Sequence, residues 1–389
     1  MDDFYPMTEM QREIRALARK IAEEKIRPVV AKYDESQEFP WEIMKVLADA
    51  DLFGVYIPEE YGGLGGGVYE LVLVVEELSR ICGGIALGLA GTALGTFPIL
   101  LYGTEEQKKK YLPDIAAGRK LAAFAVTESE AGSDASNIKT TARLDGDYYV
   151  LNGVKQWITN GGEAETYSVI AMTDKSRGAR GATAFIIEKG MPGFSFGKKE
   201  DKLGIRASAT RELVFEDCRV HKDQVLGGIG RGFFVTMKTF DYSRPGVAAQ
   251  ALGIAQGAFD LAIEYAHGRV QFGRPVTANQ GVQFMLADMA TKIECSRALT
   301  YNLAMAVDAG RKVNLAKYSS MSKFFTSDTA MEVATNALQL FGGYGYMREY
   351  PIEKFFRDAK ITQIYEGTNQ IQRDIIGKEL IKEVAQRKR

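Results

Sequence analysis

The spacing of apolar residues along the chain changes twice. Up to about residue 120, apolar positions recur every three or four residues, as on one face of a helix. From 121 to 229 they alternate with polar positions in short runs rich in Val, Thr, Tyr and Phe, which indicates strands. Helical spacing then returns to residue 389. We therefore predict an α+β protein, mostly α, with an N-terminal helical domain (1–120), a central antiparallel β domain (121–229) and a C-terminal helical domain (230–389). This order excludes a doubly wound α/β fold.

Cap residues mark where helices of the first block begin. Thr8 and Gln11 form a capping-box pattern ahead of an apolar stripe. Thr104 is followed by two glutamates, which a helix N-terminus favours, so a helix is predicted over 104–117. A further short helix is predicted over 41–53.

Two segments between these helices are more apolar. Residues 69–80 carry an apolar stripe and predict a helix with Glu76 and Glu77 on its solvated side. Residues 85–101 are almost entirely apolar but contain glycines and Pro98, so we expect a buried helix with close backbone packing. No apolar run is expected to approach the roughly 20 residues of a membrane-spanning helix.

The central block contains strand-length runs and turn signals. Asp145-Gly146 and Asn152-Gly153 are both typical of two-residue hairpin turns. β-branched and aromatic residues predict strands over 148–151, 167–172, 183–187 and 212–215.

Long helices and one unusual connection make up the last block. Helices are predicted over 247–267, 279–309 and 316–341. The stretch ITQIYEGTNQ (361–370) then reads as a connection between two further helices, with Thr368 as the N-cap of the second.

Composition narrows the function. Hydrophobic content of 46% and charged content of 25% are ordinary for a soluble globular protein. The net charge of −1 gives no support for binding to nucleic acid or anionic membranes. Two histidines and three dispersed cysteines predict no metal site, and free thiols fit a reducing compartment. The acidic N-terminal segment lacks the apolar core of a secretory signal, so we expect a cytoplasmic protein, or a mitochondrial-matrix protein after loss of a transit peptide if the source is eukaryotic.

One carboxylate stands out in the connection 361–370. Glu366 lies between Tyr365 and Gly367. In an apolar cleft, loss of solvation would raise its pKa into the useful range of a general base. By itself the position fits a solvated loop glutamate better, so the hypothesis depends on the other motifs.

Two motifs of the β block could contact a ligand. FAVTESEAGSD (124–134) is a strand that runs into a polar loop, with hydroxyls at Thr127 and Ser133, although an ordinary strand-to-turn junction looks the same. WITNGG (157–162) places a tryptophan two residues before Thr159. That pair suits a flat heteroaromatic ligand, and a core tryptophan fits equally well.

Two motifs of the C-terminal helical block could also contact a ligand. RVQFG (269–273) offers a cation, an amide and an aromatic ring for a phosphate and an adenine, or a cationic helix C-terminus. QLFGGYG (339–345) ends a helix at paired glycines, where backbone can approach a ligand or simply cap the helix. No GxGxxG motif after a strand and no P-loop is present, so nicotinamide and nucleotide-triphosphate chemistry are not indicated.

Together and in this order, the motifs resemble the acyl-CoA dehydrogenase family of flavoproteins. The resemblance covers essentially the whole chain, from PEEYGGLG (58–65) to IYEGTNQIQR (364–373). FDYSRPG (240–246) and IYEGT most resemble its medium- and short-chain branch. The resemblance implies a C-terminal four-helix bundle, a homotetramer arranged as a dimer of dimers, and FAD as the cofactor.

The resemblance also implies which residues hold the cofactor. It places four residues at the isoalloxazine: Val126, Thr127, Trp157 and Thr159. Ser133 would lie beside the cofactor and CoA, and Thr368 and Gln370 would complete the pocket. A neighbouring subunit would hold the pyrophosphate and adenine through Arg269, Gln271, Phe272, Gln339 and Gly343.

The implied reaction is α,β-dehydrogenation of an acyl-CoA thioester to the 2-enoyl-CoA. Glu366 would remove the α-proton while the β-hydride passes to flavin N5, and electrons would leave to electron-transferring flavoprotein. Some branches carry the base at the position of Ser243, which cannot act as a base here. The resemblance implies substrate contacts from Ser133, Phe240, Asp241, Ser243, Arg244, Tyr365, Gly367, Ala86 and Ala90.

The chain departs from the family pattern in two places. SEAGSD (129–134) replaces the usual PGAGSD and puts Glu130 near the expected phosphates. GIALGLAGTALG (84–95) is small and apolar, with no cation to anchor a dicarboxylate. Ala86 and Ala90 therefore suggest a wide pocket for an apolar medium, branched or cyclic acyl chain.

Two alternatives stay open. An acyl-CoA oxidase would reoxidise the same flavin with O2, but such enzymes usually carry an added C-terminal domain. A non-catalytic, flavin-binding, DNA-associated paralogue would carry a basic region, which the net charge does not support.

Overall fold

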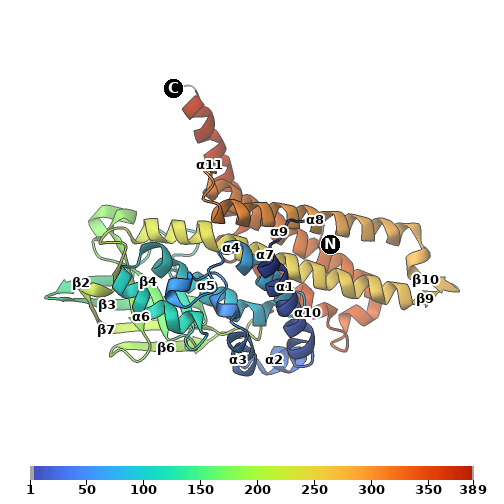
Figure 1. The fold of residues 1–389 in the computed structure, drawn as a ribbon, viewed down its shortest axis with the longest axis horizontal. Coiled ribbons are helices and arrows are strands. Elements are labelled where there is room, and N and C mark those ends of the chain that lie inside the picture. The colour runs from blue at the N-terminus through green and yellow to red at the C-terminus, as the bar shows by residue number, and fades with distance from the viewer. Residues whose placement is uncertain (1–3, 388–389) are drawn as a thin grey trace.

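The chain folds in the predicted order of helices, strands and helices (Figure 1). The computed structural model describes residues 4–387, so the first three residues of the acidic N-terminal segment lie outside it. The strands gather at one end of an elongated molecule, and the long C-terminal helices run to the other end (Figure 1). The α+β class, mostly α, is confirmed.

The first block is helical throughout. Its α-helices are α1 (Glu9–Ile21), α2 (Val30–Ser36), α3 (Trp41–Asp49), α4 (Val68–Ser79), α5 (Gly83–Tyr102) and α6 (Glu105–Ala116). The capping box of α1 is confirmed, because the Gln11 N–H donates to Thr8 Oγ1 at 3.2 Å and the Thr8 N–H donates to Gln11 Oε1 at 2.9 Å. Thr104 caps α6 in the same way.

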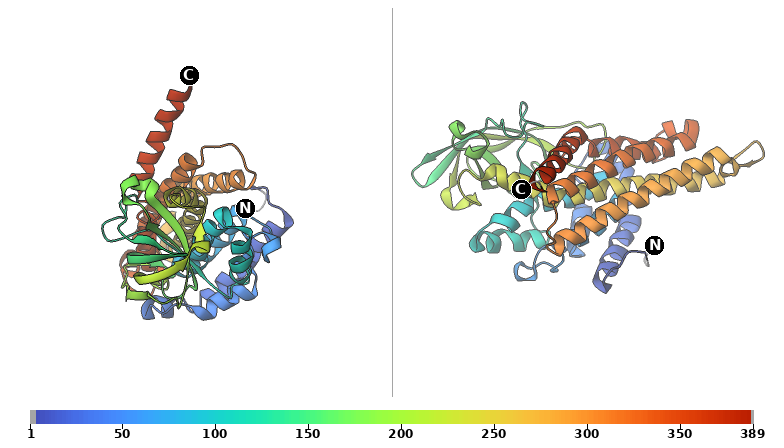
Figure 2. Two further views of the ribbon diagram at one scale, coloured as in Figure 1. Left: turned by 90° about the vertical axis from the view of Figure 1, so that its left-hand side faces the viewer. Right: turned by 90° about the horizontal axis from the view of Figure 1, so that it is seen from above.

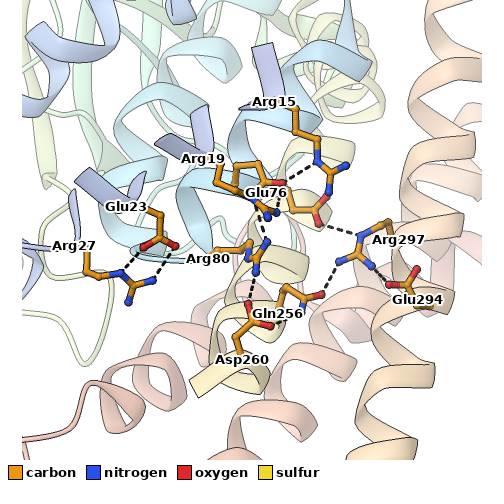
Figure 3. A network of polar contacts seen from close by, with 11 residues as sticks. Arg15, Arg19, Glu23, Arg27, Glu76, Arg80, Gln256, Asp260, Glu294 and Arg297 are labelled. Carbon is orange, nitrogen blue, oxygen red and sulfur yellow. Dashed lines mark hydrogen bonds and ion pairs between the residues drawn. The ribbon is translucent and has the colours of Figure 1, made fainter. Parts of the chain in front are cut away.

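The prediction that Glu76 and Glu77 face solvent is wrong. Both are buried in a network of polar contacts between α1, α4 and the C-terminal helices (Figure 3). Glu77 accepts a hydrogen bond from Arg15 Nε at 2.8 Å, and Glu76 accepts from Arg297 Nε at 3.1 Å and from the Tyr301 hydroxyl at 2.6 Å. These partners lie far away in the sequence, so the local pattern could not reveal them.

Two helices are longer and more apolar than the sequence analysis expected. Among the described residues, α5 and α7 (Gly232–Gly268) are long and apolar enough to cross a membrane, so the expectation about membrane-length runs was wrong. Most of each helix is buried inside the protein. They are core helices, as predicted for residues 85–101.

The sheet is mixed rather than antiparallel. Its path runs β6-β7-β3-β2-β4-β5-β8, and β1 pairs with β4. Its strands are β1 (Ala122–Ala125), β2 (Thr141–Asp145), β3 (Tyr148–Thr159), β4 (Thr166–Met172), β5 (Ala182–Glu188), β6 (Phe194–Lys199), β7 (Thr210–His221) and β8 (Val225–Leu226). The β1–β4 and β2–β4 pairs are parallel. Both join strands that are distant in sequence, which permits the crossover that parallel pairing needs.

Only one of the two hairpin signals forms a hairpin. Asp145 pairs with Tyr148 across a two-residue turn, which confirms the first. Asn152-Gly153 lies inside β3, where the register with β7 shifts. A Cβ on Gly153 would lie 2.6 Å from Thr140 Oγ1, so this glycine permits a close backbone approach and not a turn.

Five α-helices and a small hairpin make up most of the remaining described residues, up to 387. They are α7, β9 (Val270–Gln271), β10 (Arg274–Pro275), α8 (Gln280–Asp308), α9 (Leu315–Phe341), α10 (Ile352–Thr362) and α11 (Asn369–Arg387). Helix α7 starts earlier than predicted and passes through FDYSRPG, with Pro245 inside it. It packs on α4, α5, α8, α9 and α10, whereas α11 projects away from the body (Figures 1 and 2).

Candidate active site

Glu366 lies, as predicted, on a connection between two helices. Helix α10 ends at Thr362, and α11 begins at Asn369. The Ile371 N–H donates to Thr368 Oγ1 at 3.3 Å, which confirms Thr368 as the cap of α11. Glu366 has a φ of 51° and Gly367 a φ of 91°. A left-handed backbone at a glutamate is uncommon and typical of functional sites, which hold it in place through surrounding contacts.

Glu366 lines a cavity between the β domain and helices α5 and α7. Ser243 of α7 donates its hydroxyl to Glu366 Oε2 at 2.6 Å. Burial raises the pKa of Glu366 above its usual value, while the Ser243 hydrogen bond and the charges of Arg244 and Lys323 oppose that rise. The environment therefore makes this carboxylate a stronger base than one in water.

The turn that carries Glu366 is fixed through its carbonyl oxygens. Gln372 Nε2 donates to the carbonyl oxygens of Glu366 at 3.0 Å and Gly367 at 2.9 Å. Lys323 of α9 donates to the Gly367 oxygen at 2.9 Å and to Asn369 Oδ1 at 2.9 Å. No sequence signal pointed to Lys323, because it lies on another helix without a local motif.

The cavity brings together most of the predicted flavin and acyl contacts. Its volume is about 140 Å³. Predicted residues that line it are Val126, Thr127, Trp157, Thr159, Phe240, Ser243, Tyr365, Glu366 and Ala90. Residues that the sequence analysis missed are mainly apolar and include Leu71, Leu87, Leu94, Phe97, Phe124, Val247 and Gln250. Their signal is ordinary core periodicity, which does not distinguish a cavity wall from packed core.

Strand β3 presents its tryptophan through an irregular backbone. The register between β3 and β7 shifts between Lys155 and Ile158, and Trp157 has a φ of 58°. The bulge lets Lys155 point inward, where it donates to the Val126 oxygen at 2.9 Å and to Glu128 Oε1 at 2.7 Å. Trp157 is 55% exposed, so its ring remains available at the cavity mouth.

Several predicted residues lie outside the cavity lining. Ser133 and Gln370 are exposed, and Ala86 is buried in the core of α5. Arg244 is buried under the turn, with its Nε 3.5 Å from the Glu366 carbonyl oxygen. Asp241 is also buried and accepts from Lys238 Nζ at 3.5 Å. In the part of the chain that the structure describes, no cluster of His, Cys, Asp and Glu is placed to hold a metal ion.

A second hollow lies at the opposite end of the molecule. Arg269, Gln271, Gln339 and Gly343 all line it, and its volume is about 580 Å³. Phe272 is fully exposed on the nearby β9–β10 hairpin (Figure 1). Helix α7 runs from the first site, at Ser243, to its end beside Arg269. These 26 residues of helix (269 − 243) separate the two sites by roughly 39 Å at 1.5 Å per residue.

Comparison with known proteins covers all three blocks. The chain matches the models of the acyl-CoA dehydrogenase N-terminal domain over residues 8–119, middle domain over 123–218 and C-terminal domain over 230–381. It is 47% identical over 380 residues to the probable acyl-CoA dehydrogenase FadE25 of Mycobacterium tuberculosis, covering 98% of this chain and 97% of the relative.

Solved structures agree. Butyryl-CoA dehydrogenase from Megasphaera elsdenii has a TM-score of 0.95 and 46% identity, covering 97% of this chain and 99% of that one. A chain in the structure of the electron transferring flavoprotein of Acidaminococcus fermentans has a TM-score of 0.95 and 50% identity, with the same coverage. The protein therefore belongs to the acyl-CoA dehydrogenase family.

Proposed function

We propose that the protein converts an acyl-CoA thioester to its 2-enoyl-CoA, with Glu366 as the base that removes the α-proton. The family assignment makes it an oxidoreductase acting on CH–CH donors. One observation carries the assignment of the base: the Glu366 carboxylate is the only carboxylate lining the cavity shared with Thr127, Trp157 and Thr159, among the residues described.

FAD is the cofactor, and its isoalloxazine accepts the β-hydride when bound. The residues present fit it. Beside the cavity, Trp157 offers a half-exposed indole to a flat ring, and Thr127 and Thr159 offer hydroxyl groups. In the second hollow, Arg269 suits a diphosphate, and Gln271 and Gln339 offer amides to an adenine.

The protein's own part in the reaction is proton removal in a dry site. A carboxylate is a weak base for a carbon-bound proton, so burial that raises the pKa of Glu366 helps it accept one. The hydroxyl of Ser243 orients the carboxylate from one side. We infer that the backbone N–H of Glu366 supports the charge that develops on the thioester oxygen.

The acyl chain is proposed to be apolar. Apart from Glu366, every side chain that lines the cavity is uncharged, and Leu71, Leu87, Leu94 and Phe97 supply much of its wall. A medium, branched or cyclic acyl group remains the proposal, and butyryl-CoA is the natural short probe because the M. elsdenii enzyme is so similar.

The proposed assembly is a homotetramer that passes electrons to electron-transferring flavoprotein. The two candidate cofactor sites of one chain are about 39 Å apart along α7, so a second copy must supply the phosphate-binding half. The similarity to a chain in the A. fermentans flavoprotein structure supports that electron acceptor.

Anaerobic mixing with a panel of acyl-CoAs tests the function. We expect loss of the oxidised flavin absorbance with butyryl-CoA or a branched or cyclic analogue, and none with glutaryl-CoA. Turnover should be fast with electron-transferring flavoprotein and slow with O2. Rapid peroxide formation under air would favour the oxidase alternative, and an unchanged flavin spectrum with every acyl-CoA would contradict the proposal.

A further inference from the structure

We propose that Lys323 is a positioning residue for Glu366, because its buried ammonium group holds the 366–369 turn in place and supplies positive charge beneath the carboxylate. The inference rests on the proposed role of Glu366 as the base. Lys323 does not line the cavity, so its effect would be exerted through the turn.

The contacts of Lys323 span the turn. Its Nζ lies 2.9 Å from the Gly367 carbonyl oxygen and 2.9 Å from Asn369 Oδ1, on either side of Thr368. Asn369 Nδ2 in turn donates to Asp328 Oδ1 at 2.7 Å. The turn is therefore bound to α9 through the Lys323 ammonium group and the Asn369 side-chain amide.

A lysine at position 323 is expected to destabilise the fold unless its charge is well paired. Lys323 is completely buried on α9, and a buried ammonium group costs folding free energy unless it is well paired. The positive φ values of Glu366 and Gly367 mark a backbone that surrounding contacts must hold. A cation that bonds to a carbonyl oxygen of this turn meets that need directly.

The charges that face Lys323 define its effect on proton transfer. They are Glu366 on the turn, Arg244 on α7 and Asp328 on α9. Burial lowers the pKa of Lys323 to about 7, and Glu366 opposes that shift. In acid the group is therefore an ammonium ion, which favours the ionised form of Glu366. Removal of this charge should move the acid limb of the pH–rate profile to higher pH.

The test isolates proton removal from hydride transfer. In 3-thiabutyryl-CoA a sulfur atom replaces the β-carbon, so Glu366 can remove the α-proton but no hydride can leave. Exchange of the α-protons in D2O by the FAD-loaded enzyme, followed by mass spectrometry over a range of pH, reports on the base alone. FAD content and hydrogen–deuterium exchange of the 364–369 peptide are measured in parallel.

Three variants separate the contributions of Lys323. Lys323→Met should slow α-proton exchange at neutral pH by about tenfold or more. The acid limb of its pH–rate profile should also lie about one unit higher in pH than in the wild type. Lys323→Gln keeps a hydrogen-bond donor but loses the charge. The 364–369 peptide should therefore exchange its amide hydrogens more slowly than in Lys323→Met, while the acid limb should still lie at higher pH than in the wild type. Lys317→Met is the matched control, because Lys317 is a mostly buried lysine of α9 that pairs with Glu383 at 2.6 Å, away from the turn.

The outcomes are distinguishable. A wild-type exchange rate and acid limb in folded Lys323→Met protein would overturn the inference. If Lys323→Met does not fold, an unchanged acid limb in Lys323→Gln does the same. Wild-type exchange by Glu366→Gln would instead show that the base lies elsewhere, which contradicts the proposed function independently of Lys323.

Discussion

At the scale of single residues, Glu366 combines features that oppose stability. It has a left-handed backbone, a partly buried carboxylate and a pKa raised by loss of solvation. Its contacts compensate, since Ser243 donates to the carboxylate and Gln372 and Arg244 lie at its carbonyl oxygen. Such a residue is expected to limit stability while it enables the reaction.

Replacement of Glu366 by Gln should abolish most of the rate of flavin reduction by substrate. The general-base contribution is commonly about 10²–10⁴-fold, and a carbon-bound proton places the loss at the upper end or beyond. Stopped-flow reduction of the flavin measures it. FAD content should not change, and acyl-CoA affinity should stay within roughly tenfold, the pattern of a group that acts in the transition state.

The same replacement should raise the melting temperature at neutral pH. A carboxyl group whose folded-state pKa lies above its unfolded value contributes stability at low pH, and this contribution disappears as pH rises through the folded value. Near neutrality the ionised carboxylate therefore opposes folding, and Gln removes that penalty while it can still accept from Ser243. The gain should vanish in acid, where calorimetry should find the two proteins alike.

A carboxylate at position 243 should rescue part of the activity. Ser243 Oγ is 2.6 Å from Glu366 Oε2, so Ser243→Glu in the Glu366→Gln background places a base near the same point. The single Ser243→Glu change serves as the control. It should be impaired, because two buried carboxylates in contact cannot both ionise.

At the scale of elements, the buried ion pairs between α1, α4 and α8 join the N- and C-terminal helices (Figure 3). Arg297 and Glu76 are both almost fully buried, and Glu76 also accepts from Tyr301. A pair of this kind adds little over apolar packing when intact, but loss of one partner leaves a buried charge.

Arg297→Met should therefore destabilise the protein by about 3–5 kcal/mol. Urea denaturation, followed by helical circular dichroism, measures the change. Adding Glu76→Gln should recover a substantial part, because it removes the stranded charge. As a control, Lys292→Met breaks the exposed pair of Lys292 on α8 and Glu332 on α9, and should cost no more than about 1 kcal/mol.

The same elements show what the sequence could and could not reveal. The caps Thr8 and Thr104 were predicted correctly, because a cap depends on residues three positions apart. Glu76 and Gly153 were misassigned for the opposite reason. The partner of Glu76 is on α8, and Gly153 is constrained by Thr140, so their environments arise only from tertiary packing.

The residues of the candidate site also fall into predicted and unpredicted groups. The approach of Thr159 and Trp157 to Glu366 was anticipated from motifs, because the family resemblance carries three-dimensional information that periodicity lacks. The support beneath the turn was not anticipated. Lys323 and Gln372 occupy ordinary helical positions, and only the fold brings Lys323 to the carbonyl oxygen that it binds.

At the scale of the whole molecule, helix α11 extends from the body (Figure 2). Several of its apolar side chains are exposed. Ile381 is 73% exposed, and Leu380 and Val384 are about half exposed. Apolar residues along a projecting helix are typical of an interface with another copy.

Ile381→Asp should therefore weaken the proposed tetramer. Analytical ultracentrifugation should detect dimers or monomers at concentrations where the wild type remains tetrameric. Lys378→Ala, an exposed change on the same helix at a residue paired only with Asp374 among the contacts described, should leave assembly intact. An unchanged sedimentation coefficient for Ile381→Asp would contradict this role of α11.

The separation of the two hollows along α7 has a genetic consequence. If one complete site takes Glu366 from one copy and Arg269 from another, a cell that carries Glu366→Gln on one allele and Arg269→Ala on the other makes mixed assemblies. In a mixed pair, one site receives both lesions and the other receives none. Two alleles that are each inactive alone should then complement, and the restored activity should follow the fraction of mixed pairs.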